Sequence, residues 1–330
     1  IEAKLPLSAI IQTNEGTVET EPIITCKIKG DTTYIAVSNG DKINLIGNPV
    51  KQEETPFNPE TPILIHGANT LTGWTNSSAA SIEGAEQTGI LKTDGSHFYT
   101  DDYGTGTGWH GPAMKTSLGS SIQDFRFDIG FSMKSTGQNQ AGSVEVALLD
   151  ANSRIVARMI MTKHFGGTPT LYSRMIAGTG ANRYDVMREG AANFNNSFGG
   201  VFRLTRRGNV WTAYVYLMEK GVFQIPIVSN WIDFDNIFMT PVTQVQARVL
   251  QRGDFPVVEQ KINDIQVYRL NNKTDGQVPI IAKTGDIVEF NHETDLITLN
   301  GFDITSEKSF IGEYFPLVPG QNVLMAEPMD

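Results

Sequence analysis

The sequence predicts an all-β chain built of antiparallel β-sandwiches, and three observations support this fold class. Short runs rich in Val, Ile, Phe and Tyr recur along the chain, and several alternate apolar and polar residues. Turn residues such as Asn39-Gly40-Asp41 and Asn300-Gly301 separate these runs. No long stretch shows a convincing helical period, although residues 174–188 are ambiguous. Strands spaced by roughly 8–12 residues are typical of sandwiches and not of βαβ units.

The expected strands are short and follow one another along the chain. Each is rich in β-branched or aromatic residues, which suit a pleated, half-buried surface. Gly208-Asn209 lies between two of them, and Asp254 follows another, as expected for turns. The predicted strands are residues 33–37, 125–131, 144–149, 201–204, 211–217, 245–249 and 262–270.

Composition changes twice along the 330 residues, whose net charge is −10. Residues 1–60 carry a net charge of −4, residues 61–270 carry +1, and residues 271–330 carry −7. All basic residues of the two flanks are Lys, whereas the middle holds 12 Arg, 6 Lys and all four Trp. Because the two ends resemble each other, we expect one domain interrupted by an inserted one. Three consecutive domains are the alternative, but flanks of about 60 residues would each be marginally stable alone.

The junctions agree with an insertion. Residues 53–62 form a polar stretch punctuated by Pro, which cannot continue a central strand, and residues 271–276 are equally polar and turn-prone. The predicted division is therefore 1–60 and 271–330 for the interrupted domain, with 61–270 as the insert.

Charge and composition argue against several classes of function. An acidic chain lacks the basic footprint of nucleic-acid binders and would be repelled by an anionic membrane surface. No apolar run approaches the roughly 20 residues that span a bilayer. The single Cys26 excludes an internal disulfide framework and a cysteine-based zinc site. Because Ile1 is not a start methionine and no signal peptide follows, we expect a fragment or a processed piece.

Catalytic motifs are missing from the sequence. It contains no nucleophile elbow, His-Glu-x-x-His motif, phosphate loop or EF-hand loop, and its five His share no ligand spacing. The paired carboxylates of sandwich glycosidases are also absent, since Glu145 and Asp150 would point to opposite faces of a strand. We therefore expect no enzymatic activity and no cofactor. Asp101 and Asp102 could contribute to a Ca²⁺ site, but two carboxylates fall far short of its usual six to eight oxygens, and no metal site is predicted.

The densest candidate binding segment is residues 94–112, which combines aromatic, acidic and His residues with five Gly. Sugars present apolar C–H faces, which aromatic rings cover, and hydroxyls, which carboxylates and imidazoles bind. Glycines allow both to approach closely. The alternative is a surface loop whose aromatic rings seal the sandwich core. The candidate ligand-binding residues in this segment are Tyr99, Asp101, Asp102, Tyr103, Trp109 and His110.

Trp231 is a second candidate platform for a sugar ring. It lies in the sequence Ser-Asn-Trp-Ile-Asp-Phe-Asp, so Asp233 and Asp235 stand close to it. Trp211 alternates within an expected strand, which predicts a place in the core, and we expect Trp74 to be structural as well.

The two flanks resemble the C-terminal galectin-like domain of siphophage distal tail proteins (Dit). The resemblance rests on residues 14–24 (NEGTVETEPII), on Gly285–Phe290 followed by Leu299-Asn300-Gly301, and on the ending at residues 314–322 (YFPLVPGQN). Some members of that family carry a carbohydrate-binding module inserted into this domain. The middle segment is similar to such modules, most visibly at residues 109–112 and 264–268.

The resemblance implies a discontinuous galectin-like β-sandwich with an inserted concanavalin-like jelly-roll β-sandwich. It also implies a non-catalytic protein of the virion tail tip, or baseplate, that binds host cell-wall polysaccharide and other tail proteins. The family's N-terminal ring-forming domain does not precede Ile1, so we expect this piece alone to be monomeric. Two alternatives remain: a polysaccharide-degrading jelly-roll enzyme and a structural spacer that contacts other tail proteins.

Overall fold

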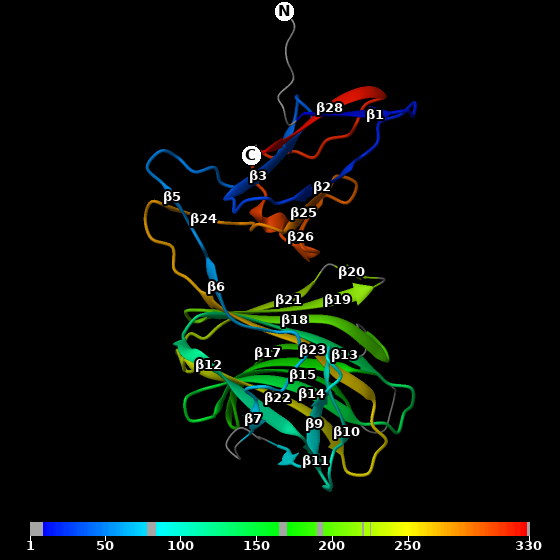
Figure 1. The fold of residues 1–330 in the computed structure, drawn as a ribbon, viewed down its shortest axis with the longest axis vertical. Coiled ribbons are helices and arrows are strands. Elements are labelled where there is room, and N and C mark those ends of the chain that lie inside the picture. Colours follow the sequence, from blue (N-terminus) through cyan, green and yellow to red (C-terminus); the bar gives the residue numbers. More distant parts are fainter. Residues whose placement is uncertain are drawn as a thin grey trace, which may run out of the picture. The chain divides into compact units, whose positions relative to one another are not determined.

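The computed structural model describes residues 9–77, 84–164, 170–189, 194–219, 221–224 and 226–328. The chain divides into two compact units (Figure 1). We name the two units by their order along the chain. The outer unit consists of Ile1–Pro59 together with Asn271–Asp330, and the inner unit consists of Glu60–Leu270. No helix formed by the described residues is long and apolar enough to cross a membrane.

The outer unit is built from two four-stranded sheets, and both of its chain segments supply strands to each sheet. The first sheet has the order β1 (Ile10–Asn14), β28 (Gly320–Glu327), β3 (Tyr34–Ser38), β4 (Ile43–Gly47). The second has the order β2 (Ile23–Lys27), β25 (Ile287–Asn291), β26 (Leu296–Leu299), β27 (Phe302–Asp303). The core of the outer unit includes Ile35 and Ile46 from one chain segment and Val288 and Phe290 from the other. Neither segment could therefore bury this core without the other.

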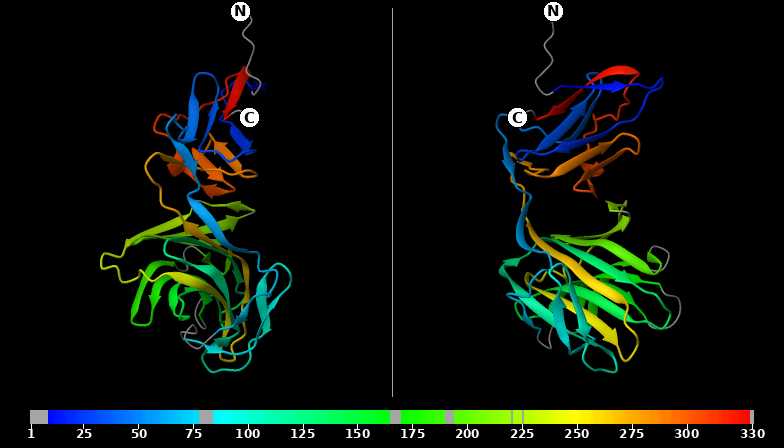
Figure 2. Two further views of the ribbon diagram at one scale, coloured as in Figure 1. Left: turned by 60° about the vertical axis from the view of Figure 1, so that its left-hand side comes forward. Right: turned by 45° about the vertical axis from the view of Figure 1, so that its right-hand side comes forward.

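The chain enters and leaves the inner unit side by side. Strand β5 (Thr55–Phe57) pairs in parallel with β24 (Gln277–Pro279), and the two segments run side by side (Figures 1 and 2). The Asn271 N–H donates to the Pro59 carbonyl at 2.8 Å. A short 3-10 helix, η2 (Thr305–Glu307), completes the regular structure described in the outer unit. Adjacent entry and exit points are the geometry that tolerates an inserted domain.

The inner unit contains two nine-stranded sheets. The first has the order β20 (Val222–Phe223), β19 (Val210–Glu219), β18 (Ser197–Arg207), β13 (Phe125–Lys134), β23 (Glu259–Leu270), β10 (Phe98–Asp102), β9 (Ile90–Thr93). Strand β21 (Ile227–Ile232) pairs with β19, and β6 (Glu60–His66) pairs with β23. These two strands widen the sheet beside β19 and β23.

The second sheet has the order β17 (Asn182–Glu189), β16 (Tyr172–Thr179), β15 (Ile155–Lys163), β14 (Gly142–Leu149), β22 (Val242–Arg252), β11 (Trp109–Gly111), β8 (Glu86–Gln87). Strand β12 (Ala113–Ile122) pairs with both β22 and β7 (Thr75–Asn76). The two sheets stack as layers in Figures 1 and 2.

One continuous apolar core lies between the two sheets of the inner unit. Alternate residues of β13, among them Phe127 and Ile129, are fully buried, and so are Val144 and Val146 of β14. This period of two is what a strand with one core-facing side requires. The prediction of an all-β chain of sandwiches is confirmed.

The ambiguous segment 174–188 belongs to a hairpin, because β16 and β17 pair antiparallel with Met175 opposite Met187. Trp211 and Trp74 are buried, as expected, and the Trp211 ring meets Phe125 edge-on at 5.8 Å. The apolar residues of the hairpin that suggested a helix instead occupy the core-facing positions of two short strands.

Candidate functional site

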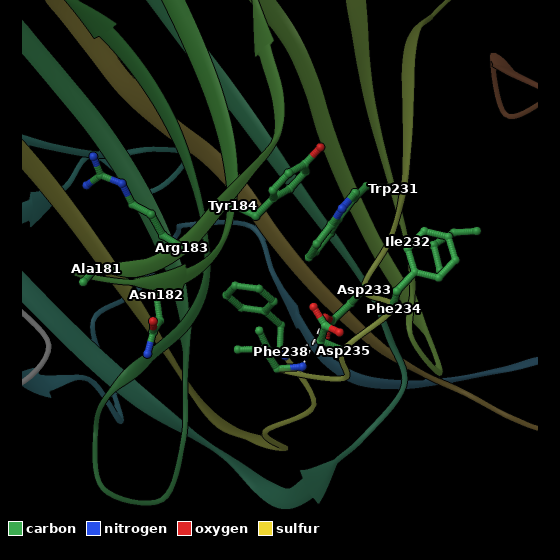
Figure 3. Close-up of a pocket in the computed structure, with 11 residues that line it drawn as sticks. Ala181, Asn182, Arg183, Tyr184, Trp231, Ile232, Asp233, Phe234, Asp235 and Phe238 are labelled. Atoms are coloured by element: carbon green, nitrogen blue, oxygen red, sulfur yellow. Dashed lines mark hydrogen bonds between the residues drawn. The ribbon is translucent and has the colours of Figure 1, made fainter.

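A pocket of about 360 Å³ opens at one edge of the inner unit (Figure 3). One wall comes from the turn between β16 and β17 and the start of β17, and the other comes from the end of β21 and the segment after it. The pocket is lined by Ala181, Asn182, Arg183, Tyr184, Trp231, Ile232, Asp233, Phe234, Asp235, Ile237 and Phe238. It therefore depends on both sheets.

Stacked aromatic rings form the apolar part of this pocket. Tyr184 and Trp231 lie nearly parallel, at 14°, with ring centroids 3.9 Å apart (Figure 3). Phe238 meets Trp231 edge-on at 5.4 Å. Tyr184 retains 42% of its surface exposed, whereas Trp231 is half-buried. Such rings offer a flat apolar surface to a ligand, and little conformational entropy is lost when they bind it.

A glycine permits this packing. Gly178 in β16 has φ +77°, and a Cβ on it would lie 2.3 Å from Cε1 of Phe238. Any side chain at this position would both strain the backbone and displace the Phe238 ring.

Two buried polar side chains fix the segment that follows Trp231. The Asp233 carboxylate accepts hydrogen bonds from the Ile237 N–H at 3.1 Å and the Phe238 N–H at 2.7 Å. The Arg206 guanidinium is fully buried and donates to the Phe238 carbonyl at 3.0 Å and the Thr240 carbonyl at 2.8 Å. Burial lowers the pKa of Arg206 to about 10, so it stays charged at neutral pH. The pocket wall is thus held in place before any ligand arrives.

The rim of the pocket is polar. Asn182, Arg183 and Asp235 are exposed, and within the described part of the chain their side chains make no hydrogen bond or ion pair. In Figure 3 the Asn182 and Arg183 side chains come from the wall opposite Asp235. An amide, a guanidinium and a carboxylate are therefore all available to bind hydroxyl groups.

The same pocket is poorly equipped for hydrolysis. Of its two carboxylates, Asp233 is 2% exposed and both of its oxygens already accept backbone N–H groups. Asp235 is left as the one accessible acid among the lining residues. Glycoside hydrolysis usually needs two carboxylates beside the scissile bond. The described residues also contain no group of three His, Cys, Asp or Glu that could hold a metal ion.

Of the residues proposed from sequence, only Trp231 lines this pocket. The other six lie on β10, on β11 or between them. In the first sheet, β23, β13, β18 and β19 separate β10 from β21. The structure therefore splits the predicted ligand-binding set into two distant regions.

The acidic members of the 94–112 segment have protein partners. Asp101 forms an ion pair with Lys92, which holds the pKa of that carboxyl below its usual value. Asp102 accepts the Gly104 N–H at 3.0 Å. Tyr99 is half-buried and lies opposite Lys92 in the sheet. These contacts bind the loop to β9 and to itself.

Two further members pack inward. Tyr103 lies against the core, its hydroxyl accepts a hydrogen bond from Gln260 at 3.0 Å, and burial raises its pKa. His110 is 2% exposed, with Nδ1 3.1 Å from the Gly108 carbonyl oxygen. A Cβ on Gly106 would lie 2.7 Å from the His110 ring. The loop's aromatic and Gly residues here pack against the protein, as in the alternative in which the loop seals the core.

Trp109 differs from its neighbours in the 94–112 segment because it stays half-exposed on β11. Its ring lies edge-on to His164 with centroids 6.3 Å apart, and the Arg252 guanidinium lies 5.9 Å from its centroid. Trp109 is therefore part of an aromatic and cationic cluster on the second sheet, away from the pocket.

Sequence reasoning missed Tyr184, Phe238 and the rim residues Asn182 and Arg183. The turn-forming residues Gly178, Gly180 and Asn182, with Tyr184 two positions after Asn182, were the available signal for a turn with a nearby aromatic residue. The stacking of Tyr184 on Trp231 could not be read from sequence, because the two strands belong to different sheets.

No family model and no curated protein sequence matches this chain. Solved structures, in contrast, do match this chain. The CBM2 module of the evolved Dit of Lactobacillus casei BL23 phage J-1 has a TM-score of 0.54 at 14% identity, covering 66% of this chain and 98% of the module. That share of this chain is close to the length of the inner unit.

Two lectin-like structures are more distant. A legume lectin-like domain from Entamoeba histolytica has a TM-score of 0.38 at 8% identity, covering 64% of this chain and 99% of that one. The lumenal domain of VIP36, solved with Ca²⁺ and Man3GlcNAc, has a TM-score of 0.41 at 11% identity, covering 57% and 86%. The fold shared with the phage module is the finding that bears on this chain.

Proposed function

We propose that the inner unit is a non-catalytic carbohydrate-binding module, inserted into a galectin-like domain, and that it binds host cell-wall polysaccharide in the Trp231 pocket. One observation carries this proposal: stacked aromatic rings meet, in one pocket on a fixed scaffold, polar side chains that have no partner among the described residues. This combination matches the two kinds of surface that a sugar presents.

The chemistry of binding follows from the lining. The exposed Tyr184 ring covers the C–H face of a sugar, while Asn182, Arg183 and Asp235 bind its hydroxyls. Each neutral hydrogen bond contributes only about 0.5–1.5 kcal/mol net, because it replaces one to water. A single pocket is therefore expected to bind weakly, and several tethered copies would raise the apparent affinity by about 10²–10⁴.

The wider role is adsorption of a phage tail tip to its host. Two observations support it: the flanks resemble the Dit galectin-like domain, and the inner unit shares its fold with a module from a phage Dit. In this proposal the full-length protein contacts other baseplate proteins in the virion, and the present chain alone is monomeric.

The test is adhesion of the whole fluorescently labelled chain to intact Gram-positive cells, with purified wall polysaccharide as competitor. We expect binding that the polysaccharide abolishes and that Tyr184→Ala weakens at least 10-fold. Tyr99→Ala is the matched control, since it removes a half-buried Tyr of the 94–112 segment and should leave binding unchanged.

Other outcomes would overturn parts of the proposal. Loss of binding in Tyr99→Ala but not in Tyr184→Ala would move the site to the 94–112 segment. Shortening of the polysaccharide on incubation would establish the depolymerase instead. No binding to a broad panel of strains would favour the spacer.

A further inference from the structure

Three exposed apolar side chains line the Trp231 pocket on the same side as Asp235. We call them the apolar lip: Ile232, Phe234 and Ile237. Phe234 is 81% exposed and Ile237 58% exposed. In Figure 3, Ile232 and Phe234 lie on the side of the pocket that carries Asp235. Single exposed apolar residues are common on proteins, but three of them beside one accessible carboxylate favour a ligand with an apolar group next to a polar one.

A tight turn holds the apolar lip and the carboxylate together. The Phe234 N–H donates to the Ile232 carbonyl at 3.1 Å, and the Asn236 N–H donates to the Asp233 carbonyl at 3.1 Å. Asn236 has φ +53°, a left-handed conformation that Asn adopts more readily than most residues. The chain then returns to Ile237, whose N–H the buried Asp233 carboxylate accepts. The lip is therefore in place before a ligand binds, so little free energy is spent on ordering it.

The two walls of the pocket differ in the hydrogen bonds that they can make. Asp235, on the wall of the lip, can only accept, because a carboxylate carries no donor. On the opposite wall Arg183 can only donate, and the Asn182 amide can do both (Figure 3). Among the residues that the structure describes, none bonds to these three side chains. The pocket therefore has an acceptor on one wall and donors on the other.

This arrangement matches an acetamido group. In a trans amide the N–H and the C=O point in opposite directions, so the group needs an acceptor on one side and a donor on the other. Its methyl group lies on the same side as the N–H. With the N–H directed at Asp235, the methyl group therefore meets the apolar lip, and the carbonyl faces Asn182 and Arg183. A hydroxyl group could bind to either wall, but it would leave the lip without an apolar partner.

We infer that the Trp231 pocket selects sugars that carry an acetamido group. Asp235 accepts the amide N–H, Asn182 or Arg183 donates to the carbonyl, the methyl group packs on the lip, and the sugar ring lies against Tyr184. The inference rests on the proposed function, because it names the class of saccharide that the same pocket takes. A volume of about 360 Å³ is at the small end of ligand sites, about 300–1,000 Å³, and suits one substituted sugar residue.

The test compares sugars that differ only in this group. Polyacrylamide conjugates of N-acetylglucosamine, N-acetylgalactosamine and N-acetylmannosamine are immobilised beside conjugates of glucose, galactose and mannose. Binding of the whole chain is measured by biolayer interferometry, and the many copies of each sugar raise a weak apparent affinity. We expect at least one acetamido sugar to bind about 10-fold more tightly than its hydroxyl counterpart, because the counterpart leaves the lip and the amide partners unmatched. Equal binding within every pair would overturn the inference.

Matched variants assign the selectivity to the apolar lip. Ile237→Ala and Ile90→Ala each remove an isoleucine that is 58% exposed, the first from the lip and the second from β9. Ile237→Ala should lower the ratio of acetamido to hydroxyl binding several-fold, whereas Ile90→Ala should leave it unchanged. Phe234→Ala repeats the test at the most exposed lip residue, with exposed Phe310→Ala as its control. A ratio unchanged in both lip variants, with thermal melting as in wild type, would overturn the inference.

The wall polysaccharide tests the same preference in the expected natural ligand. Alkali removes its acetyl groups, and acetic anhydride in aqueous bicarbonate restores those on nitrogen. The deacetylated polymer should compete about 10-fold less well with cell adhesion, and the N-reacetylated polymer as well as the untreated one. Equal competition by all three would overturn the inference.

Failure of the inference and failure of the proposed function can be distinguished. If cell binding depends on Tyr184 but the deacetylated polymer competes fully, the acetamido preference fails and the adsorption role stands. If acetamido conjugates bind through Tyr184 but no cells bind, the adsorption role fails and the preference stands. If neither cells nor conjugates bind, both are wrong.

Discussion

Trp231 and Trp109 are both half-buried and both lie beside charged side chains, yet their surroundings differ. Trp231 stacks on Tyr184, and its rim offers one Arg and one Asp. Trp109 lies edge-on to His164 beside Arg252. The pocket combines stacked rings with a polar rim, whereas the Trp109 ring belongs to an edge-on aromatic cluster. The comparison shows that the tertiary contacts of a Trp, and not its neighbours in sequence, determine whether its ring is available to a ligand.

The two surfaces also differ in how they are held. Trp109 lies on a strand that pairs with β22, whereas one pocket wall is a loop fixed by Asp233 and Arg206. Changes to the loop's supports should therefore affect the pocket and leave the surroundings of Trp109 unchanged.

The largest expected effect is on stability. Arg206→Met leaves the Phe238 and Thr240 carbonyls without their buried donor, and each unsatisfied group costs about 1–3 kcal/mol. We expect a loss of about 3 kcal/mol in the free energy of unfolding, measured by urea denaturation. Arg207→Met, at the neighbouring exposed position, should change it by less than about 0.5 kcal/mol. Equal effects would show that Arg206 does not support the pocket wall.

Gly178→Ala should disturb the pocket directly. Its Cβ would meet Phe238, and φ +77° is unfavourable for Ala. We therefore expect the free energy of unfolding to fall by about 1–3 kcal/mol and saccharide binding to be lost. Gly180→Ala is the control: φ is +60° there too, but no atom lies within 4 Å of the added Cβ. It should lose some stability and keep binding. Isothermal titration with wall saccharide distinguishes the two variants.

Asp235→Asn should weaken saccharide binding by about 1 kcal/mol, roughly fivefold, because it removes a charged acceptor from the rim. Isothermal titration with wall saccharide measures this loss. An unchanged affinity would show that Asp235 does not belong to the binding site.

The smallest expected effect is that of Trp109→Ala. Removing one half-exposed ring outside the pocket should leave titration with wall saccharide unchanged. A loss of about 10-fold would place the sugar at Trp109 and break the comparison.

Much of the fold could be predicted from sequence because strand alternation reports local geometry. The runs around Phe127, Val146 and Trp211 became core strands for this reason. The hairpin of β16 and β17 could not be distinguished from a helix, since its apolar residues fit both periods over a short stretch. Tertiary pairing, not local pattern, decided it.

The candidate site was only partly predictable. Trp231 is distinctive in sequence, but Tyr184 gains its role only through contact between two sheets. The Gly-rich 94–112 segment suggested room for a ligand, whereas Gly106 makes room for the ring of His110. A glycine in a sequence indicates that another group can approach the backbone closely, but it does not identify that group.

The most direct test of the central claim is a crystal structure of this chain with a purified fragment of neutral wall saccharide. The account predicts a sugar ring against Tyr184, with its hydroxyls bonded to Asn182, Arg183 or Asp235. A saccharide bound at Trp109 with an empty Trp231 pocket would contradict it.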